Sequence, residues 1–225
     1  MIAKLPRWVL FGGIVLSFIG GMVNAAGYLS FRHQAVTHMT GTTTLLGIGV
    51  AQGDVGDMLK FGVVALAFLL GAALGGFIVR DSALRLGRRY GVALSVESVL
   101  LFTAVPLLVH DRDAGLWLAA AACGLQNAMA GTYSGAVVRT THVSGLYTDL
   151  GMYLGQWFGG VKMDARRVRL YITLVVGFFA GGVADALIYP QVGQYGLLLP
   201  AALTGLAGIT YSIYRHHHRA VPAAS

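Results

Sequence analysis

Charged residues are scarce in this sequence, which argues against a soluble protein. Only 11% of the 225 residues are charged and 56% are hydrophobic, whereas a soluble domain usually carries about 25% charged residues. The formal net charge of +7 does not indicate nucleic-acid binding, because the basic residues cluster between apolar stretches and no basic surface interleaved with aromatic residues is present. The composition therefore predicts an integral membrane protein with no room for a soluble domain.

Other absences narrow the fold class and the chemistry. Cys123 is the only cysteine, so the chain cannot form an internal disulfide, and we expect this thiol to pack as a small hydrophobe. Segments of alternating polarity, which a membrane β-barrel requires, are missing. The sequence has no P-loop, Gly-x-Ser-x-Gly elbow or His-Glu-x-x-His helix, and the three adjacent histidines at 216–218 do not converge on one ion. We expect an all-α membrane protein that is not an enzyme and has no cofactor or metal site.

Six stretches are long and apolar enough to cross a bilayer as helices, which takes about 20 residues. They are 8–28, 61–79, 90–109, 114–138, 170–189 and 195–214. The first stretch follows a basic start like that of a signal peptide, but its apolar part is long for that role. We therefore interpret it as a retained first span.

The chain contains one long internal repeat. The spacing between matched positions drifts only from 103 residues (Gly21 to Gly124) to 106 residues (Gly71 to Gly177). The matched stretches are "GMVNA" (21–25) with "GLQNA" (124–128), "THMTGTTTLLG" (37–47) with "THVSGLYTDLG" (141–151), "GAALGG" (71–76) with "GFFAGG" (177–182), and "YG" at 90–91 with "YG" at 195–196. This predicts two membrane repeats, 1–110 and 111–219, and a short tail at 220–225. The stretches 37–47 and 141–151 are called the first and second polar motifs below.

The polar motifs are followed by short apolar segments, which predict short broken or re-entrant helices. Only the 13 residues 40–52 precede the "GDVGD" loop, which is short for a crossing. If neither segment crosses, six spans leave only Arg32, Lys60 and Arg112 outside among the 16 basic residues, as the positive-inside rule prefers. Both termini are then cytoplasmic, and the second repeat is inverted. The alternative of eight spans with parallel repeats stays open.

Each polar motif predicts a helix that starts inside the membrane, where Gly41 allows a turn and a threonine at 40, 42 or 43 can cap the helix. The free N–H groups of such a helix attract a carboxylate or another anion, and His38 and His142 could supply protons or hydrogen bonds. Asn24 and Asn127 could contact a solute or brace the two motifs. The candidate binding residues are Asn24, His38, Thr40, Gly41, Thr44, Asn127, His142, Ser144, Gly145 and Thr148. Plain helix packing stays open as an explanation, because Ser, Thr and Gly are also common at helix contacts in membranes.

Three carboxylates in or near the apolar stretches are candidate proton carriers, namely Glu97, Asp149 and Asp185. A charged carboxylate facing lipid is costly, so each should face the protein interior or water. Asp149 stands where the first repeat has Leu45, so a role for it would not be doubled. Asp185 lies five residues before Pro190 and also fits a position at the membrane interface.

The stretches "GLQNA", "VRTTHVSGLYTDLG" and "THMTGTTTLLG" resemble the signature stretches of the YoaK-like bacterial membrane proteins, classed as domain of unknown function 1275. The resemblance covers nearly the whole chain. It implies a small multi-pass protein of the bacterial cytoplasmic (inner) membrane, and it implies no substrate and no catalytic residue.

These observations together predict a secondary transporter or channel-like carrier of a small polar or anionic solute, with protons as the candidate coupling ion. Its site is expected near the midplane at the interface of the two repeats, as in carriers built from inverted repeats. The alternative is a structural or regulatory membrane protein, in which the polar motifs only hold the two halves together. The expected partners are the lipid bilayer and a small solute, with no nucleic acid, and the chain is a candidate homo-oligomer.

Overall fold

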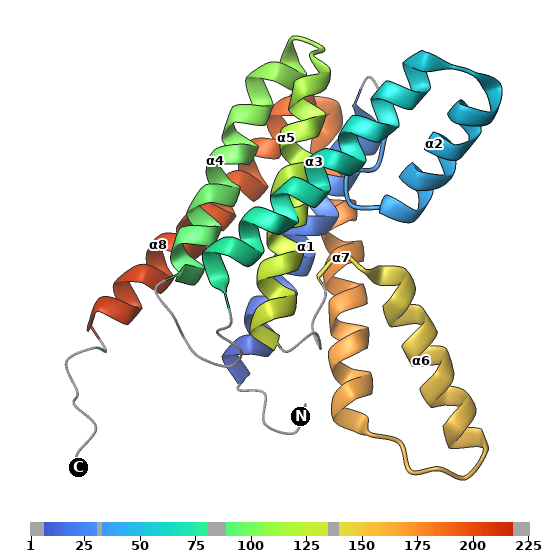
Figure 1. Ribbon diagram of the computed structural model, residues 1–225. Helices are drawn as coiled ribbons and strands as arrows, with labels where there is room; N and C mark the ends of the chain where they lie inside the picture. Colours follow the sequence, from blue (N-terminus) through green and yellow to red (C-terminus); the bar gives the residue numbers. More distant parts are fainter. Residues whose placement is uncertain (1–6, 31–32, 81–88, 135–139, 218–225) are drawn as a thin grey trace.

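The computed structural model describes residues 7–30, 33–80, 89–134 and 140–217, and the regular elements in these ranges are all helical (Figure 1), in agreement with the predicted all-α fold. The elements in chain order are α1 (Arg7–Leu29), α2 (Met39–Gln52), α3 (Val55–Val79), α4 (Arg89–Val109), α5 (Asp113–Ser134), α6 (Val143–Phe158), α7 (Ala165–Val192), the 3₁₀ turn η2 (Gly193–Leu197) and α8 (Leu198–His217).

Two long helices begin earlier than the apolar pattern predicts. α3 begins at Val55 rather than at position 61, because the Asp54 carboxylate accepts a hydrogen bond from the Asp57 amide (3.0 Å) and caps the helix. α7 begins at Ala165 rather than at position 170, where Asp164 caps it in the same way. Hydropathy locates the apolar part of a helix, whereas these polar first turns lie outside that part.

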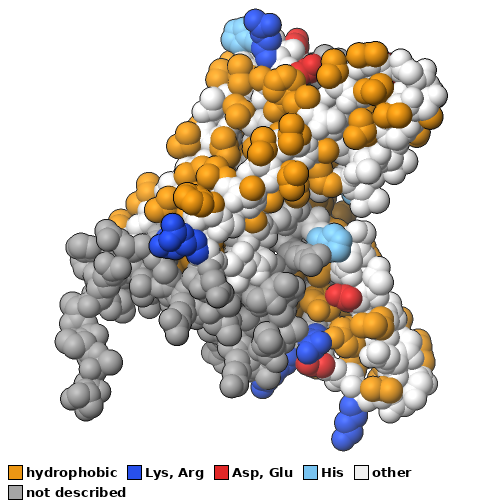
Figure 2. All heavy atoms as spheres, viewed as in Figure 1, with side chains coloured by type: hydrophobic (Ala, Val, Ile, Leu, Met, Phe, Trp, Pro, Cys, Tyr) orange, Lys and Arg blue, Asp and Glu red, His pale blue; other side chains and the backbone are white. Residues whose placement is uncertain are grey.

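Four helical segments among the described residues are long and apolar enough to cross a membrane. They are Leu10–Leu29, Val55–Val79, Arg89–Val109 and Ala165–Ile213, of which the last comprises α7, η2 and most of α8. Large apolar side chains are exposed along these helices, and Figure 2 shows them over much of the surface in view. α5 is not among the four segments, so the number of six spans stays a prediction.

The long helices form two similar parallel pairs, in which α1 packs along α7 and α3 packs along α5. Glycines let the backbones touch in both pairs, because a Cβ at these positions would collide with the partner helix. A Cβ at Gly21 would meet the backbone of Phe178 and one at Gly181 that of Phe18 in the first pair, and a Cβ at Gly124 would meet Phe68 and one at Gly71 would meet Ala121 in the second. Along each pair the contacts advance together, from Ile14 with Gly177 to Phe18 with Gly181 and from Gly71 with Ala121 to Gly75 with Leu125, so its two helices run in the same direction.

α4 and α8 pack antiparallel to each other. Gly91 lies beside Gly208, whereas the Ser98 hydroxyl, two turns further along α4, donates to the Ala201 carbonyl (2.8 Å). In Figure 1, α1, α4 and α7 run upward, and α3, α5 and α8 run downward. Each long helix of the first half therefore runs opposite to the helix at the same position in the second half.

Charged residues gather at the two ends of the bundle. One end carries mainly basic residues, namely Arg80, Arg89, Lys162, Arg166, Arg167 and Arg169, and the opposite end carries Asp54, Asp57, Asp111 and Asp113 with Lys60 and Arg112. Other basic residues in the predicted loops lie outside the described residues: Lys4, Arg32, Arg85, Arg88, Arg139 and Arg219.

Candidate functional site at the two helix breaks

The chain is non-helical just before α2 and just before α6, and these two segments lie largely inside the protein. Residues 34–38 are called the first break and residues 140–142 the second break. The side chains at 34–37 are buried, as are those at 140 and 141. Non-helical backbone at membrane depth needs hydrogen-bond partners from the protein, so the partners of the two breaks define the site.

One asparagine side chain accepts a hydrogen bond from the backbone of each break. The Asn24 side-chain oxygen accepts hydrogen bonds from the Thr37 amide (3.2 Å) and the Thr37 hydroxyl (2.8 Å). The Asn127 oxygen accepts from the Thr141 amide (3.3 Å), and the Asn127 amide group donates to the Thr141 hydroxyl. Each asparagine thus binds the polar motif of its own half, and these bonds do not link the two motifs.

The second break lies against the middle of α1. The Ser17 hydroxyl is within hydrogen-bond distance of the Thr140 carbonyl (2.9 Å) and of the Leu174 carbonyl on α7 (2.7 Å). Gly20 leaves room for Thr141, since a Cβ at Gly20 would lie 2.6 Å from the Thr141 methyl carbon. α1 therefore holds the break that belongs to the second half of the chain.

The first break lies against the same face of α1, further along the helix. Asn24 binds Thr37, as described above. Gly27 lies against Gln34, because a Cβ at Gly27 would be 2.6 Å from the Gln34 carbonyl oxygen. Positions 17, 20, 24 and 27 recur at intervals of three and four residues, so they form one stripe on a helix. Ser17 and Asn24 are seven residues apart, so the two breaks lie about 10 Å apart along α1 at 1.5 Å per residue.

Hydrogen bonds hold the second break in place. The Gln126 amide donates to the Leu16 carbonyl (2.8 Å) and to the Thr140 hydroxyl (2.8 Å), and that hydroxyl donates to the Asn127 oxygen (3.3 Å). Gln126 is 1% exposed and Thr140 is 0% exposed, so these bonds form away from water.

Apolar packing takes the place of this network at the first break. Val23, Val36 and Ala120 stand at the repeat positions of Gln126, Thr140 and Ser17. All three belong to the main buried core cluster. The two breaks therefore share the asparagine brace but differ in the chemistry that surrounds it.

The two histidines lie at the starts of α2 and α6. His38 directly precedes α2 and His142 directly precedes α6, and neither side chain makes a capping hydrogen bond. Each ring instead lies over the glycine three residues later: a Cβ on Gly41 would be 2.7 Å from His38 Nδ1, and a Cβ on Gly145 would collide with the His142 ring. Both histidines are exposed. The first amides of both helices thus have no side-chain cap.

The predicted threonine caps are wrong. α2 begins at Met39, ahead of Thr40, and Thr42 and Thr43 lie inside the helix. Their hydroxyls donate to carbonyls four residues earlier, on His38 (3.2 Å) and Met39 (2.8 Å). A hydroxyl that is already inside a helical turn bonds backward in this way and cannot cap the helix start.

The remaining hydroxyl residues of the motifs are exposed on α2 and α6. The Thr44 hydroxyl donates to the Thr40 carbonyl and the Thr148 hydroxyl donates to the Ser144 carbonyl, both at 3.0 Å. These residues are exposed rather than buried in the core. Their acceptor positions stay available to a ligand, because only the donor hydrogen is used by the helix.

The short helices do not pack against each other. α2 packs against α3 and α6 packs against α7, and in the described ranges α2 and α6 make no contact. In Figure 1 both begin near the middle of the molecule and run toward opposite ends. The structure therefore relates the two motifs through α1 and not through direct helix contact.

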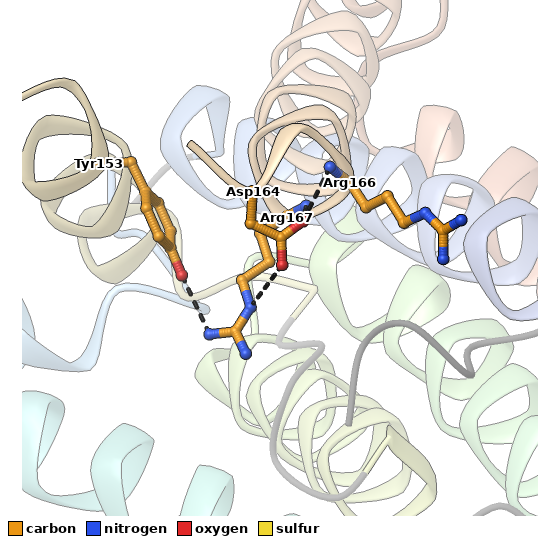
Figure 3. Close-up of polar contacts among 4 residues, drawn as sticks. All are labelled: Tyr153, Asp164, Arg166 and Arg167. Carbon is orange, nitrogen blue, oxygen red and sulfur yellow. Dashed lines mark hydrogen bonds and ion pairs between the residues drawn. The ribbon is translucent and has the colours of Figure 1, made fainter. Parts of the chain in front are cut away.

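Asp149 takes part in a polar cluster that joins α6 to α7. It interacts with Tyr171, whose ring centroid lies 6.2 Å from that of Tyr153. Figure 3 shows Tyr153 pointing to Arg167, which donates to the Tyr153 hydroxyl (3.0 Å) and pairs with Asp164 (3.3 Å), while Arg166 extends away.

Glu97 and Asp185 are both buried, at 1% and 0% exposure. Oε2 of Glu97 and both carboxylate oxygens of Asp185 have no hydrogen-bond partner in the described part of the protein. Glu97 lies near Cys123 on α5, and Asp185 lies against η2. They therefore occupy separate interior positions on α4 and α7.

Sequence reasoning missed Ser17, Gly20, Thr140 and Arg167. Ser17 and Gly20 share a helical stripe with Asn24 and Gly27, and that spacing could have revealed a common face. The contact of Ser17 with Thr140 spans 123 positions, and no local pattern indicates it.

Comparison with known proteins places the chain in a family. Residues 12–210 match the family model described as "Protein of unknown function (DUF1275)". The UPF0700 transmembrane protein RA0705 of Rhizobium meliloti (strain 1021) is 30% identical over 186 residues, which cover 83% of this chain and 78% of that protein. No solved structure matches the chain. The apolar helices and this similarity indicate a multi-pass membrane protein, and the chain belongs to the DUF1275 family of proteins of unknown function.

Proposed function

We propose that this protein is a secondary transporter or channel-like carrier of a small polar or anionic solute, which binds between the two helix breaks. One observation carries the proposal: both breaks lie on a single stripe of α1, about 10 Å apart along its axis. Each break leads into a helix whose first amides have no side-chain cap.

We further propose six spans and two re-entrant helices, arranged as inverted repeats in the bacterial inner membrane with both termini cytoplasmic. The opposite directions of α1 and α5, of α3 and α7, and of α4 and α8 support this arrangement. The excess of arginine at one end supports its assignment to the cytoplasm. Carriers with inverted repeats often bind solutes at interrupted helices near the midplane.

The helix starts suit an anionic solute. The first amides of a helix have no partner within the helix, and they carry a partial positive charge that attracts anions. His38 and His142 lie beside these amides, and their rings can add hydrogen bonds or carry protons. Gly41 and Gly145 leave room for the two rings over the first turns, because a Cβ at either position would displace the ring.

The alternative role is structural or regulatory. The hydrogen bonds of the two asparagines favour this alternative, because Asn24 binds Thr37 and Asn127 binds Thr141, each within its own half of the chain. In that case the polar motifs only satisfy the broken backbone and the protein carries no solute. A flux measurement separates the two roles.

The test is solute flux into liposomes that contain the purified protein and a pH-sensitive dye. Acetate, phosphate and glutamate are added as probes, and we expect at least one to produce a flux absent from protein-free liposomes. In the His38→Ala, His142→Ala double variant this flux should fall at least about tenfold, which corresponds to 1.4 kcal/mol of lost stabilisation. Gly47→Ala is the matched control, because open space surrounds Gly47. An unchanged flux in the double variant would exclude the histidine site.

A further inference from the structure

Asp185 lies in the interior near the end of α7, without a charge partner. It is 0% exposed, and neither carboxylate oxygen has a hydrogen-bond partner among the described residues. A buried carboxylate is expected to be paired, since an isolated charge in a low-dielectric interior is very costly. Asp185 therefore needs a compensating positive group.

η2 folds back over this carboxylate. Gly193 has a φ of 55°, a left-handed conformation that glycine adopts easily, and the chain turns there at the end of α7. Gly196 then lies against Asp185, since a Cβ at Gly196 would be 3.2 Å from Asp185 Oδ1. The turn closes this end of the bundle over the carboxylate.

Further oxygen atoms lie at the same end. Tyr189 is one turn after Asp185 and interacts with it electrostatically. The Gln194 amide group donates to the Tyr189 hydroxyl (2.9 Å), whereas Gln194 Oε1 is buried and has no hydrogen-bond partner in the described ranges. Three buried oxygen acceptors, two on Asp185 and one on Gln194, thus have no donor.

The end of α7 favours a positive charge. The carbonyl groups at a helix C-terminus carry a partial negative charge. Pro190 lies inside α7 and has no N–H, so the carbonyl of Ala186 lacks its usual donor. Carriers with interrupted helices use such carbonyls and helix ends to coordinate Na⁺ or H⁺.

We propose that Asp185, Gln194 and Tyr189 bind a sodium ion. A single carboxylate charge matches a monovalent cation, and oxygen ligands suit hard cations. Several oxygens can coordinate one metal ion at once, whereas one proton supplies only one hydrogen bond. In the described part of the chain no group of three His, Cys, Asp or Glu side chains could hold a metal, which disfavours a transition metal. A coupling role for this sodium rests on the proposed carrier function, but its binding does not.

The test is equilibrium binding of ²²Na⁺ to the purified full-length protein in detergent. The wild type should bind saturably. Asp185→Asn should weaken binding at least about tenfold, and Gln194→Leu should weaken it severalfold. Asp57→Asn, which removes another acidic residue at the same end, should bind like the wild type. Absence of saturable binding in the wild type, or full binding by Asp185→Asn, would overturn the proposal.

A second measurement guards against misfolding of Asp185→Asn. Replacing choline chloride with sodium chloride at constant ionic strength should raise the wild-type Tm by roughly 4 °C when sodium is at about ten times its Kd. Gln194→Leu, which keeps the buried charge, should lose about half of this shift if it weakens binding about fivefold. A shift that Gln194→Leu retains in full would contradict the site. Sodium binding without solute flux would contradict the proposed carrier function but not the sodium site. Solute flux without sodium binding would contradict the sodium site but not the carrier function.

Discussion

Substituting Thr140 with valine, the residue at the corresponding position of the first repeat, tests the hydrogen bonds that hold the second break. Thr140→Val removes the acceptor of one Gln126 amide hydrogen, which then stays buried without a partner. Such an orphaned donor costs about 1–3 kcal/mol, whereas interhelical hydrogen bonds in a membrane protein average about 0.6 and reach about 1.7 kcal/mol. We therefore expect Thr140→Val to lower the free energy of unfolding by about 1.5 kcal/mol.

The same substitution should be nearly neutral when Gln126 is also valine, because no donor is then orphaned and the two residues match Val23 and Val36 of the first repeat. A double-mutant cycle measured by equilibrium unfolding in mixed micelles should give a coupling energy of about 1.5 kcal/mol. Additive effects, with a coupling energy below about 0.3 kcal/mol, would contradict the hydrogen bond between Gln126 and Thr140 at the second break.

Two other predictions concern α6. Gly145→Ala should displace the His142 ring and reduce solute flux in liposomes, whereas Gly151→Ala, which meets only open space, should leave flux unchanged; equal flux in both variants would refute a role for the ring position. Arg167→Gln should change the free energy of unfolding by less than about 1 kcal/mol, because its ion pair is partly exposed. It should nevertheless speed amide exchange in α6 by removing the bond to Tyr153, and unchanged exchange would contradict a role for that bond.

Self-comparison of the sequence finds features of the fold that occur in both halves of the chain. Asn24 and Asn127, with the short helices after His38 and His142, occupy corresponding positions in the structure. Residues that differ between the repeats are harder to interpret. Gln126 stands opposite Val23 in the repeat, and only its bonds to Leu16 and Thr140 explain the difference.

Contacts between distant segments could not be predicted. Asp185 fits a membrane interface by its distance from Pro190, yet it is fully buried because η2 folds over it. The position of Gly196 against Asp185 depends on the turn at Gly193, and hydropathy carries no information on such a turn. The threonine pattern also gave the wrong start for α2, because the helix begins at Met39, directly after His38 and before its first threonine.

In the proposed six-span arrangement the two polar motifs enter the membrane from opposite sides. Single cysteines at Gln52 and Lys162, two exposed residues beside the α2–α3 and α6–α7 turns, can be introduced after replacing buried Cys123 with alanine. Labelling with a membrane-impermeant maleimide in right-side-out and inside-out vesicles then reports the side of each turn. We expect Gln52→Cys to react from outside and Lys162→Cys from the cytoplasmic side. Reaction of both from the same side would instead support eight spans with parallel repeats and contradict the account.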